Sequence, residues 1–197
     1  MGEEVLMASV REISHEILQR RGMTTVFGNP GSNELPFLTK LPESFRYVLG
    51  LHEGAVLGMA DGFAQVTGRP VLVNLHSASG SGNAMGALTN AVYARTPLVI
   101  MAGQQVRPAI GAEAMLTNVD ATQLTRPLTG WAGEPSCAQD VPRSLAQAIF
   151  EAELQRRPAY LSVRTTTGTW MPSRTRARSW TGACSAGGRP ARPSWPS

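Results

Sequence analysis

Two kinds of hydrophobic pattern alternate along the first 163 residues. Ser9 and Glu12 have the spacing of a helix capping box, and apolar residues at Val10, Ile13 and Ile17 follow at helical intervals. They predict a helix that ends near Gly22. Short runs rich in β-branched and apolar residues predict strands at 24–27, 45–49, 70–75, 97–102 and 159–163. Further helices are predicted at 34–40, 53–66, 83–94 and 141–153.

Strands that alternate with helices predict an α/β fold, a parallel sheet with helices on both faces. The run 70–75 is almost continuously apolar, as expected of a strand covered on both sides. The helix 53–66 is expected to bury the face that carries Val56, Met59, Ala60 and Phe63.

Ligands of such sheets bind at the carboxyl ends of the strands. Three predicted loops leave strand ends, at 28–33, 50–53 and 76–82, the last read as a Gly/Ser loop. We therefore expect the ligand-binding and catalytic residues in these loops.

Charge changes this picture only at the C-terminus. The 197-residue chain has a formal charge of +4, which taken alone suggests a nucleic-acid or anionic-membrane partner. However, residues 1–163 contain 12 Lys and Arg against all 14 Asp and Glu, whereas residues 164–197 contain six Arg and no acid. The basicity belongs to the last 34 residues, and we expect neither a nucleic acid nor a membrane as a partner of the rest.

Other classes are disfavoured by simple patterns. The sequence has no apolar run of 18 residues and no signal-peptide layout at its start. Its two cysteines, Cys137 and Cys184, suggest neither a disulfide framework nor a metal site, so no metal ligands are predicted and a cytoplasmic location is expected.

Each candidate residue has an ordinary structural explanation beside the functional one. Glu53 opens a predicted helix, where an acid stabilises the helix dipole. His52 and His76 can be satisfied loop histidines, and Ser32 lies in a Gly/Pro/Asn turn. The glycines of 80–86 follow a strand, but their G-x-G-x-x-x-G spacing is one residue too long for a dinucleotide fingerprint, and close helix packing explains them better.

Together, three segments and several later ones resemble a known family. The segments are Phe27-Gly28-Asn29-Pro30-Gly31-Ser32-Asn33-Glu34, then His52-Glu53 with Met59-Ala60-Asp61-Gly62-Phe63-Ala64, then Asn74-Leu75-His76-Ser77 through Gly82-Asn83-Ala84. In this order they resemble the N-terminal pyrimidine-binding domain of the thiamine-diphosphate-dependent 2-oxo-acid decarboxylases, most closely the benzoylformate branch. The resemblance runs from about residue 7 to residue 163.

The resemblance implies a carbon–carbon lyase that decarboxylates an aryl 2-oxo acid. Glu53 would bind N1′ of the aminopyrimidine, which calls for a carboxyl group whose pKa is raised by a dry pocket. Ser32 would contact the substrate carboxylate, and His76 would move protons on later adducts. The residues expected at the cofactor are Glu53, Asn29, Pro30, Gly31 and Asn83. His52 stands where the benzoylformate branch is expected to have glutamine.

The resemblance also implies what this chain would not supply alone. Full-length members bind the diphosphate through Mg²⁺ in a C-terminal domain and assemble as homotetramers, so we expect an N-terminal fragment without activity of its own. We divide the chain into residues 1–6, a pyrimidine-binding domain at 7–163, and a basic, disordered tail at 164–197. Shifting the frame by one base at Arg164 can encode Pro-Tyr-Asp-Asp-Trp-Asp, the expected continuation, so a frameshift is our hypothesis for the tail.

Three alternatives stay open from the sequence. The first is another branch of the family, such as an acetolactate synthase-like enzyme. The second is a Rossmann-type nucleotide-binding domain that uses the glycines of 80–86. The third is a nucleic-acid-binding protein whose contacts come from the arginines of the tail.

Overall fold

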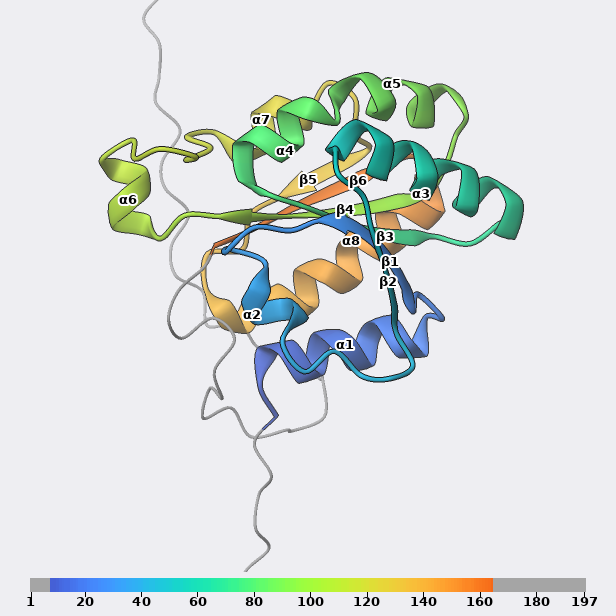
Figure 1. Ribbon diagram of the computed structural model, residues 1–197, viewed down its shortest axis with the longest axis horizontal. Coiled ribbons are helices and arrows are strands. Elements are labelled where there is room, and N and C mark those ends of the chain that lie inside the picture. Colours follow the sequence, from blue (N-terminus) through green and yellow to red (C-terminus); the bar gives the residue numbers. More distant parts are fainter. Residues whose placement is uncertain (1–7, 165–197) are drawn as a thin grey trace, which may run out of the picture.

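A parallel six-stranded sheet forms the centre of the fold in the computed structural model, which describes residues 8–164 (Figure 1). The strands are β1 (Thr25–Asn29), β2 (Arg46–Leu49), β3 (Val71–Leu75), β4 (Leu98–Gln104), β5 (Trp131–Gly133) and β6 (Ala159–Arg164). Their order is β2-β1-β3-β4-β6-β5, and every neighbouring pair is parallel. The predicted fold class is confirmed.

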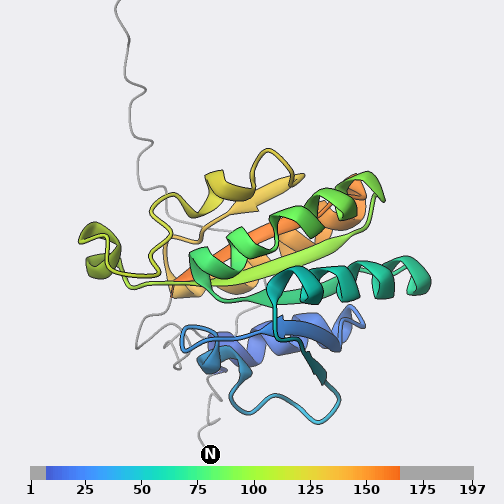
Figure 2. The same ribbon diagram turned by 45° about the horizontal axis from the view of Figure 1, so that its top comes forward.

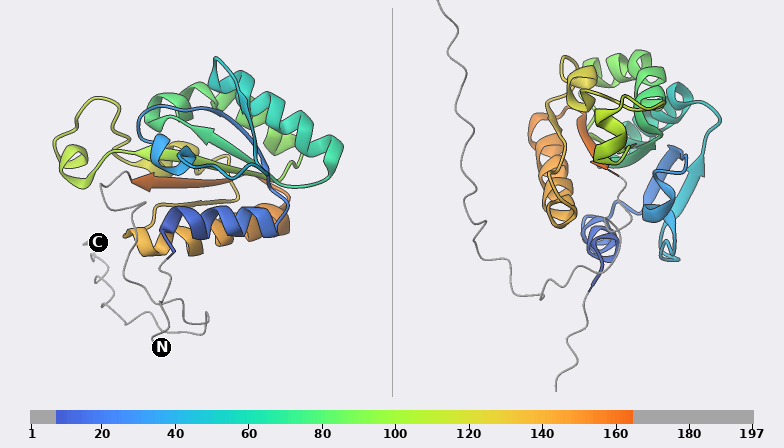
Figure 3. Two further views of the ribbon diagram at one scale, coloured as in Figure 1. Left: turned by 60° about the horizontal axis from the view of Figure 1, so that its bottom comes forward. Right: turned by 90° about the vertical axis from the view of Figure 1, so that its left-hand side faces the viewer.

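Helices cover both faces of the sheet. They are α1 (Val10–Arg20), α2 (Leu35–Leu38), α3 (Glu53–Thr67), α4 (Ser77–Asn83), α5 (Met85–Tyr93), α6 (Arg107–Gly111), α7 (Ala121–Thr125) and α8 (Val141–Gln155), with a short 3₁₀ turn at Ala138–Asp140. Figure 3 shows α1 and α8 together on one face, and Figure 2 shows α3, α4 and α5 along the other.

Each face has its own hydrophobic core. On the α1/α8 side, Leu18 and Ile149 pack against strand residues such as Leu72 and Val99. On the α3/α5 side, Leu57 and Leu88 pack with the opposite-facing strand residues, including Val73 and Ile100. Alternate residues of one strand therefore pack into opposite cores. This explains why the sequences of the central strands are continuously apolar.

Local sequence signals set several helix ends. The capping box predicted at Ser9 and Glu12 is present, with the Glu12 amide donating to Ser9 Oγ and the Ser9 amide donating to Glu12 Oε2. Helix α3 ends at Gly68, whose φ of +67° lies in the left-handed region that glycine adopts without steric cost. Pro142 lies in the first turn of α8, where its missing N–H removes no helical hydrogen bond.

Residues 76–82 were predicted to form a loop. This prediction is wrong, because most of the segment belongs to helix α4. The Gly80 amide donates to the His76 carbonyl (2.8 Å), and Ser81 Oγ bonds both the Ser77 carbonyl and the hydroxyl of Tyr160. Small side chains let this helix pack closely against β4. Gly80–Gly86 therefore forms no phosphate loop, which removes the support for a Rossmann-type nucleotide site.

Two further expectations need correction. In α3, Val56 and Ala60 are buried as predicted, but Met59 and Phe63 are 41% and 37% exposed because Leu57 and Ala64 take the core-facing positions instead. Strand β6 extends one residue past the predicted boundary, so Arg164 pairs with Gln104 in the sheet rather than starting the tail. The short elements α6, α7 and β5 were not predicted. Residues 1–7 and 165–197, with the expected extension and the rest of the tail, lie outside the described residues.

Candidate functional site

The three predicted loops meet at the carboxyl edge of the sheet. Loop 28–33 follows β1, His52 and Glu53 follow β2, and His76 follows β3, and β1 lies between β2 and β3. In Figure 1 this edge lies toward the side on which α6 projects. Parallel pairing brings these segments together although they are some 20 residues apart in the sequence.

Glu53 is a buried carboxylate, 7% exposed, at the first position of α3. Its Oε1 accepts a hydrogen bond from Asn29 Nδ2 and its Oε2 accepts one from Asn83 Nδ2, both at 3.0 Å. A Cβ on Gly80 would lie only 3.2 Å from Cγ of Glu53, so the missing side chain there lets α4 pack against this carboxylate. Three of the predicted cofactor-binding residues, Glu53, Asn29 and Asn83, thus form one cluster.

The pKa of Glu53 is shifted in the direction opposite to our expectation. Burial raises the pKa of this carboxyl group, as predicted. Hydrogen bonds from Asn83, from the Glu53 backbone amide and from Asn29, with a contribution from nearby His52, outweigh burial and leave the pKa below its ordinary value. The prediction of a raised pKa is therefore wrong for this arrangement, because amide donors stabilise the ionised form.

His52 positions Glu53 through the helix start rather than by direct contact. It is the N-cap of α3, with extended backbone, and its Nδ1 accepts a hydrogen bond from the Gly54 amide (3.1 Å). A helix capped in this way begins at Glu53, which places the carboxylate at the positive end of the helix dipole.

A second buried carboxylate, Glu34, organises the neighbouring part of the site. It is 3% exposed, and His76 Nδ1 lies 2.8 Å from its Oε2. The same oxygen accepts a hydrogen bond from the Gly31 amide, and Oε1 accepts one from the Gly103 amide, both at 2.8 Å. Glu34 therefore joins the chain segments that follow β1 and β3 to the end of β4.

Close backbone approach explains two glycines of this cluster. A Cβ on Gly31 would lie 2.2 Å from Nδ1 of His76, and a Cβ on Gly103 would lie 2.0 Å from Oε1 of Glu34. Both distances are far inside van der Waals contact. Gly31 was predicted to lie at the cofactor, and in this structure its missing side chain allows the approach of His76.

The remaining predicted residues flank these clusters. Ser32 is exposed in the turn between β1 and α2, and Pro30 is half-buried. No hydrogen bond among the described residues joins Ser32 to Glu53 or His76. Sequence reasoning missed Glu34 as a site residue. The available signal was a carboxylate three residues after Gly31, at a spacing that lets it accept a hydrogen bond from the amide of the turn.

Residues 8–164 lack two features that would point to other functions. This part of the chain has no helix long and apolar enough to span a membrane. It also holds no group of three or more His, Cys, Asp or Glu side chains placed to bind a metal ion.

Sequence comparison relates the chain to enzymes of one cofactor class. The family model for the thiamine pyrophosphate enzyme N-terminal TPP binding domain matches residues 8–124. A benzoylformate decarboxylase of Pseudomonas aeruginosa is 68% identical over 158 residues, which cover 80% of this chain and 30% of the relative. The mitochondrial acetolactate synthase catalytic subunit of Aspergillus candidus is 31% identical over 149 residues, 75% of this chain and 21% of the relative.

Solved structures agree with the sequence relatives. The thiamine diphosphate-dependent 4-hydroxybenzoylformate decarboxylase of Rhodococcus jostii RHA1 superposes with a TM-score of 0.81 at 58% identity, covering 89% of this chain and 34% of that enzyme. The benzoylformate decarboxylase of Polynucleobacter necessarius gives a TM-score of 0.79 at 40% identity, covering 89% and 33%. The chain spans about a third of the length of these decarboxylases.

Proposed function

The chain belongs to the thiamine pyrophosphate enzymes through their N-terminal TPP binding domain, and we propose that it supplies the pyrimidine-binding side of the active site of an aryl 2-oxo-acid decarboxylase. The observation that carries the proposal is Glu53, a buried carboxylate at the N-terminus of α3, held between the amides of Asn29 and Asn83. A carboxyl group in this setting can share a proton with an aromatic nitrogen.

The residues present fit the aminopyrimidine part of thiamine diphosphate. Glu53 offers a carboxylate for a ring nitrogen, and Asn29, Pro30, Gly31 and Asn83 would border the ring. When bound, this cofactor supplies a carbon nucleophile and the electron sink that decarboxylation of a 2-oxo acid requires. The proposal covers the pyrimidine side only, and it assigns the diphosphate and Mg²⁺ to another part of the assembled enzyme.

The lowered pKa of Glu53 is compatible with this role. The shift depends on two side-chain amides that donate to the carboxylate. A ligand that displaces one amide and excludes water removes a stabilising donor and strengthens the burial effect, and both changes raise the pKa. Glu53 would therefore gain proton affinity when its pocket fills, which is when proton sharing is needed.

His76 and Ser32 are proposed to act on the substrate side. Because Glu34 accepts at Nδ1, the neutral imidazole of His76 carries its proton on that nitrogen and leaves Nε2 as the proton acceptor. His76 can therefore take up or return a proton at Nε2. Ser32 is exposed in the turn that packs against His76, and its hydroxyl group would donate a hydrogen bond to a substrate carboxylate.

The substrate class rests on the names of the relatives. Enzymes named for benzoylformate and 4-hydroxybenzoylformate match at 68% and 58% identity, whereas the acetolactate synthase matches at 31%. We therefore propose an aryl 2-oxo acid as the substrate, which the assembled enzyme would convert into an aldehyde and CO₂.

A domain replacement tests the proposal. Residues 8–164 would replace the matching domain of the Pseudomonas aeruginosa decarboxylase, to which the chain is 68% identical, and CO₂ release from benzoylformate would be measured with thiamine diphosphate and Mg²⁺. We expect an active chimera that loses activity on Glu53→Gln and keeps it on Glu43→Gln, an exposed acid outside the site. A folded chimera that binds the cofactor but is inactive would refute the proposal.

We also propose that α3 contributes to a homo-oligomer contact. Met59, Phe63 and Val66 follow one another at helical spacing on α3 and are 41%, 37% and 89% exposed. Tyr93, at the end of the neighbouring α5, is also largely exposed. A row of exposed apolar residues on one helix face is typical of a surface that another subunit covers.

A further inference from the structure

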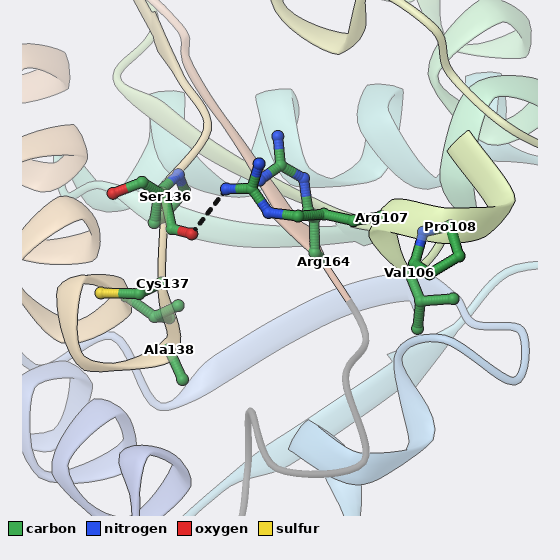
Figure 4. Close-up of a pocket in the computed structure, with 9 residues that line it drawn as sticks. Val106, Arg107, Pro108, Ser136, Cys137, Ala138 and Arg164 are labelled. Atoms are coloured by element: carbon green, nitrogen blue, oxygen red, sulfur yellow. Dashed lines mark hydrogen bonds between the residues drawn. The ribbon is translucent and has the colours of Figure 1, made fainter. Parts of the chain in front are cut away.

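A cavity outside the candidate active site is lined by two arginines. It has a volume of about 150 Å³ and lies between the segment that follows β4 and the segment that joins β5 to α8. Its lining residues are Val106, Arg107, Pro108, Pro135, Ser136, Cys137, Ala138, Val141 and Arg164. Figure 4 shows the guanidinium groups of Arg107 and Arg164 in the space between the two segments.

Arg164 has hydrogen-bond donors that no described residue uses. Its Nη2 pairs with Glu134 Oε1, but its Nε and Nη1 are buried and have no partner within residues 8–164. A buried donor without an acceptor is destabilising, and because these two atoms have almost no accessible surface, Arg164 acts on the cavity through its charge. A guanidinium group carries a positive charge, so Arg164 adds to the positive charge of the cavity.

The neighbouring charges leave the cavity positive. Both oxygens of Glu134 are engaged, Oε1 by Arg164 and Oε2 by the hydroxyl of Ser162 (2.8 Å). Arg107 donates through Nη2 to the backbone carbonyl of Ser136 (2.9 Å), which carries no net charge. Asp140 is engaged elsewhere, with Arg143, Ser136 Oγ and Cys137 Sγ. The lining therefore contributes two guanidinium groups, Arg107 and Arg164, and only Glu134 offsets them. This leaves an excess of one positive charge.

The rest of the lining is mainly apolar and the space is small. Val106, Pro108, Pro135, Ala138 and Val141 contribute no charged group. A cavity of about 150 Å³ is large enough for a single six-membered ring. Most ligand pockets are at least about twice that volume, so a nucleotide or coenzyme does not fit.

From this combination we propose that the cavity binds a small organic monocarboxylate, with its carboxylate on Arg107 and Arg164 and an apolar body of at most one ring against the opposite wall. One negative charge balances the excess positive charge, and the carboxylate oxygens can accept hydrogen bonds from Arg107, which is exposed and uses only Nη2 among the described residues. Carboxylate–guanidinium pairs are among the stronger hydrogen-bonded pairs in proteins. This site is independent of the proposed decarboxylase function, because it shares no residue with the Glu53 and Glu34 clusters.

Titration calorimetry on the full 197-residue chain tests the site with benzoate as the probe. We expect one benzoate to bind, and benzamide, which lacks the charge, and inorganic phosphate, which lacks the apolar body, to bind at least about tenfold more weakly. Arg107→Gln should weaken benzoate binding at least about tenfold, since it removes a charge-assisted contact of about 1.4 kcal/mol or more. The matched control is Arg143→Gln, an arginine beside Asp140 that does not line the cavity and should leave binding unchanged.

Two further variants protect the test from misleading results. Arg164→Gln leaves Glu134 without its charged partner and can unfold the chain, so Val106→Trp, at a partly exposed position, serves to fill the cavity instead. His76→Ala separates this site from the candidate active site and should not affect binding. Absence of benzoate binding, equal binding of phosphate, or a loss on His76→Ala without a loss on Arg107→Gln and Val106→Trp would each overturn the proposal.

Discussion

Nδ1 of His76 lies 2.8 Å from Oε2 of Glu34, and this contact holds the Nδ1 side of the imidazole against a buried carboxylate. Glu34 is held in turn by the amides of Gly31 and Gly103. We therefore propose that the carboxylate is a positioning residue, which orients the imidazole and selects its tautomer. It would not itself touch the substrate.

Replacing Glu34 with glutamine should loosen this arrangement. Glutamine presents an NH₂ group where the carboxylate accepts, so one of three buried donors loses its acceptor, and the free energy of unfolding should fall by about 1–3 kcal/mol. In the chimeric decarboxylase, kcat should fall at least about tenfold, part of the 10²–10⁴-fold that acid–base catalysis contributes. Nitrogen chemical shifts of His76 should show a mixture of tautomers, which a purely structural role would not require. Glu43→Gln is the control, and an unchanged tautomer in Glu34→Gln would contradict the positioning role.

Because of the Glu53 carboxylate, the free energy of unfolding should change with pH in the acidic range. Its pKa in the folded chain is below the ordinary value of 4.5, since hydrogen bonds from Asn83 and Asn29 outweigh burial. A depressed pKa means that ionised Glu53 stabilises the fold above pH 4.5, and that this contribution disappears as pH falls through the lower folded-state pKa. Urea unfolding of the wild type and Glu53→Gln at several pH values measures it. The difference between the two should shrink below pH 4.5, and a constant difference from pH 7 to pH 3 would contradict the assignment.

Two glycines with different surroundings, Gly103 in β4 and Gly62 in α3, test the packing around Glu34. A Cβ at Gly103 would overlap Oε1 of Glu34, whereas a Cβ at Gly62, on α3, has no neighbour within 4 Å. Gly103→Ala should destabilise the chain by about 1–3 kcal/mol and displace the carboxylate. Gly62→Ala should stabilise it by about 0.5–1 kcal/mol, as alanine does in a helix interior. Thermal unfolding of both variants measures the contrast, and equal effects would mean that the Glu34 contact is not tightly packed.

Alternating patterns in the sequence were sufficient to predict the parallel sheet and the edge at which the site forms. The run 70–75 and the spacing around Val10 reflect burial, which acts on every residue of an element. Helix α4 was missed because its glycines and serines have low helix propensity. Its stability comes instead from packing against β4 and from the Ser81–Tyr160 hydrogen bond, between residues 79 positions apart.

Some residues of the candidate site were predicted, but their contacts were not. The resemblance to a family supplied Glu53, Asn29 and Asn83, and the structure places these three in hydrogen-bond contact. The sign of the Glu53 pKa shift depends on the balance of burial against amide donors, and a linear sequence does not encode that balance. Glu34 was missed for a related reason, since its donor Gly103 lies 69 positions away and becomes its neighbour only through strand order.

The exposed row on α3 leads to the last prediction, that this face associates with another copy of the chain. Val66 is 89% exposed, so a charge at this position should not disturb folding, whereas the ring of Phe63 packs against Phe27 of the core (ring centroids 5.5 Å apart). Val66→Glu should therefore lower the self-association of the chain, measured by sedimentation velocity over a range of concentrations, and leave the unfolding temperature unchanged. Leu154→Glu is the matched control, because Leu154 is 66% exposed on α8, in the layer across the sheet. An interface on α3 requires the two variants to differ. If both weaken association equally, or if neither does, contact between subunits does not run through Met59, Phe63 and Val66.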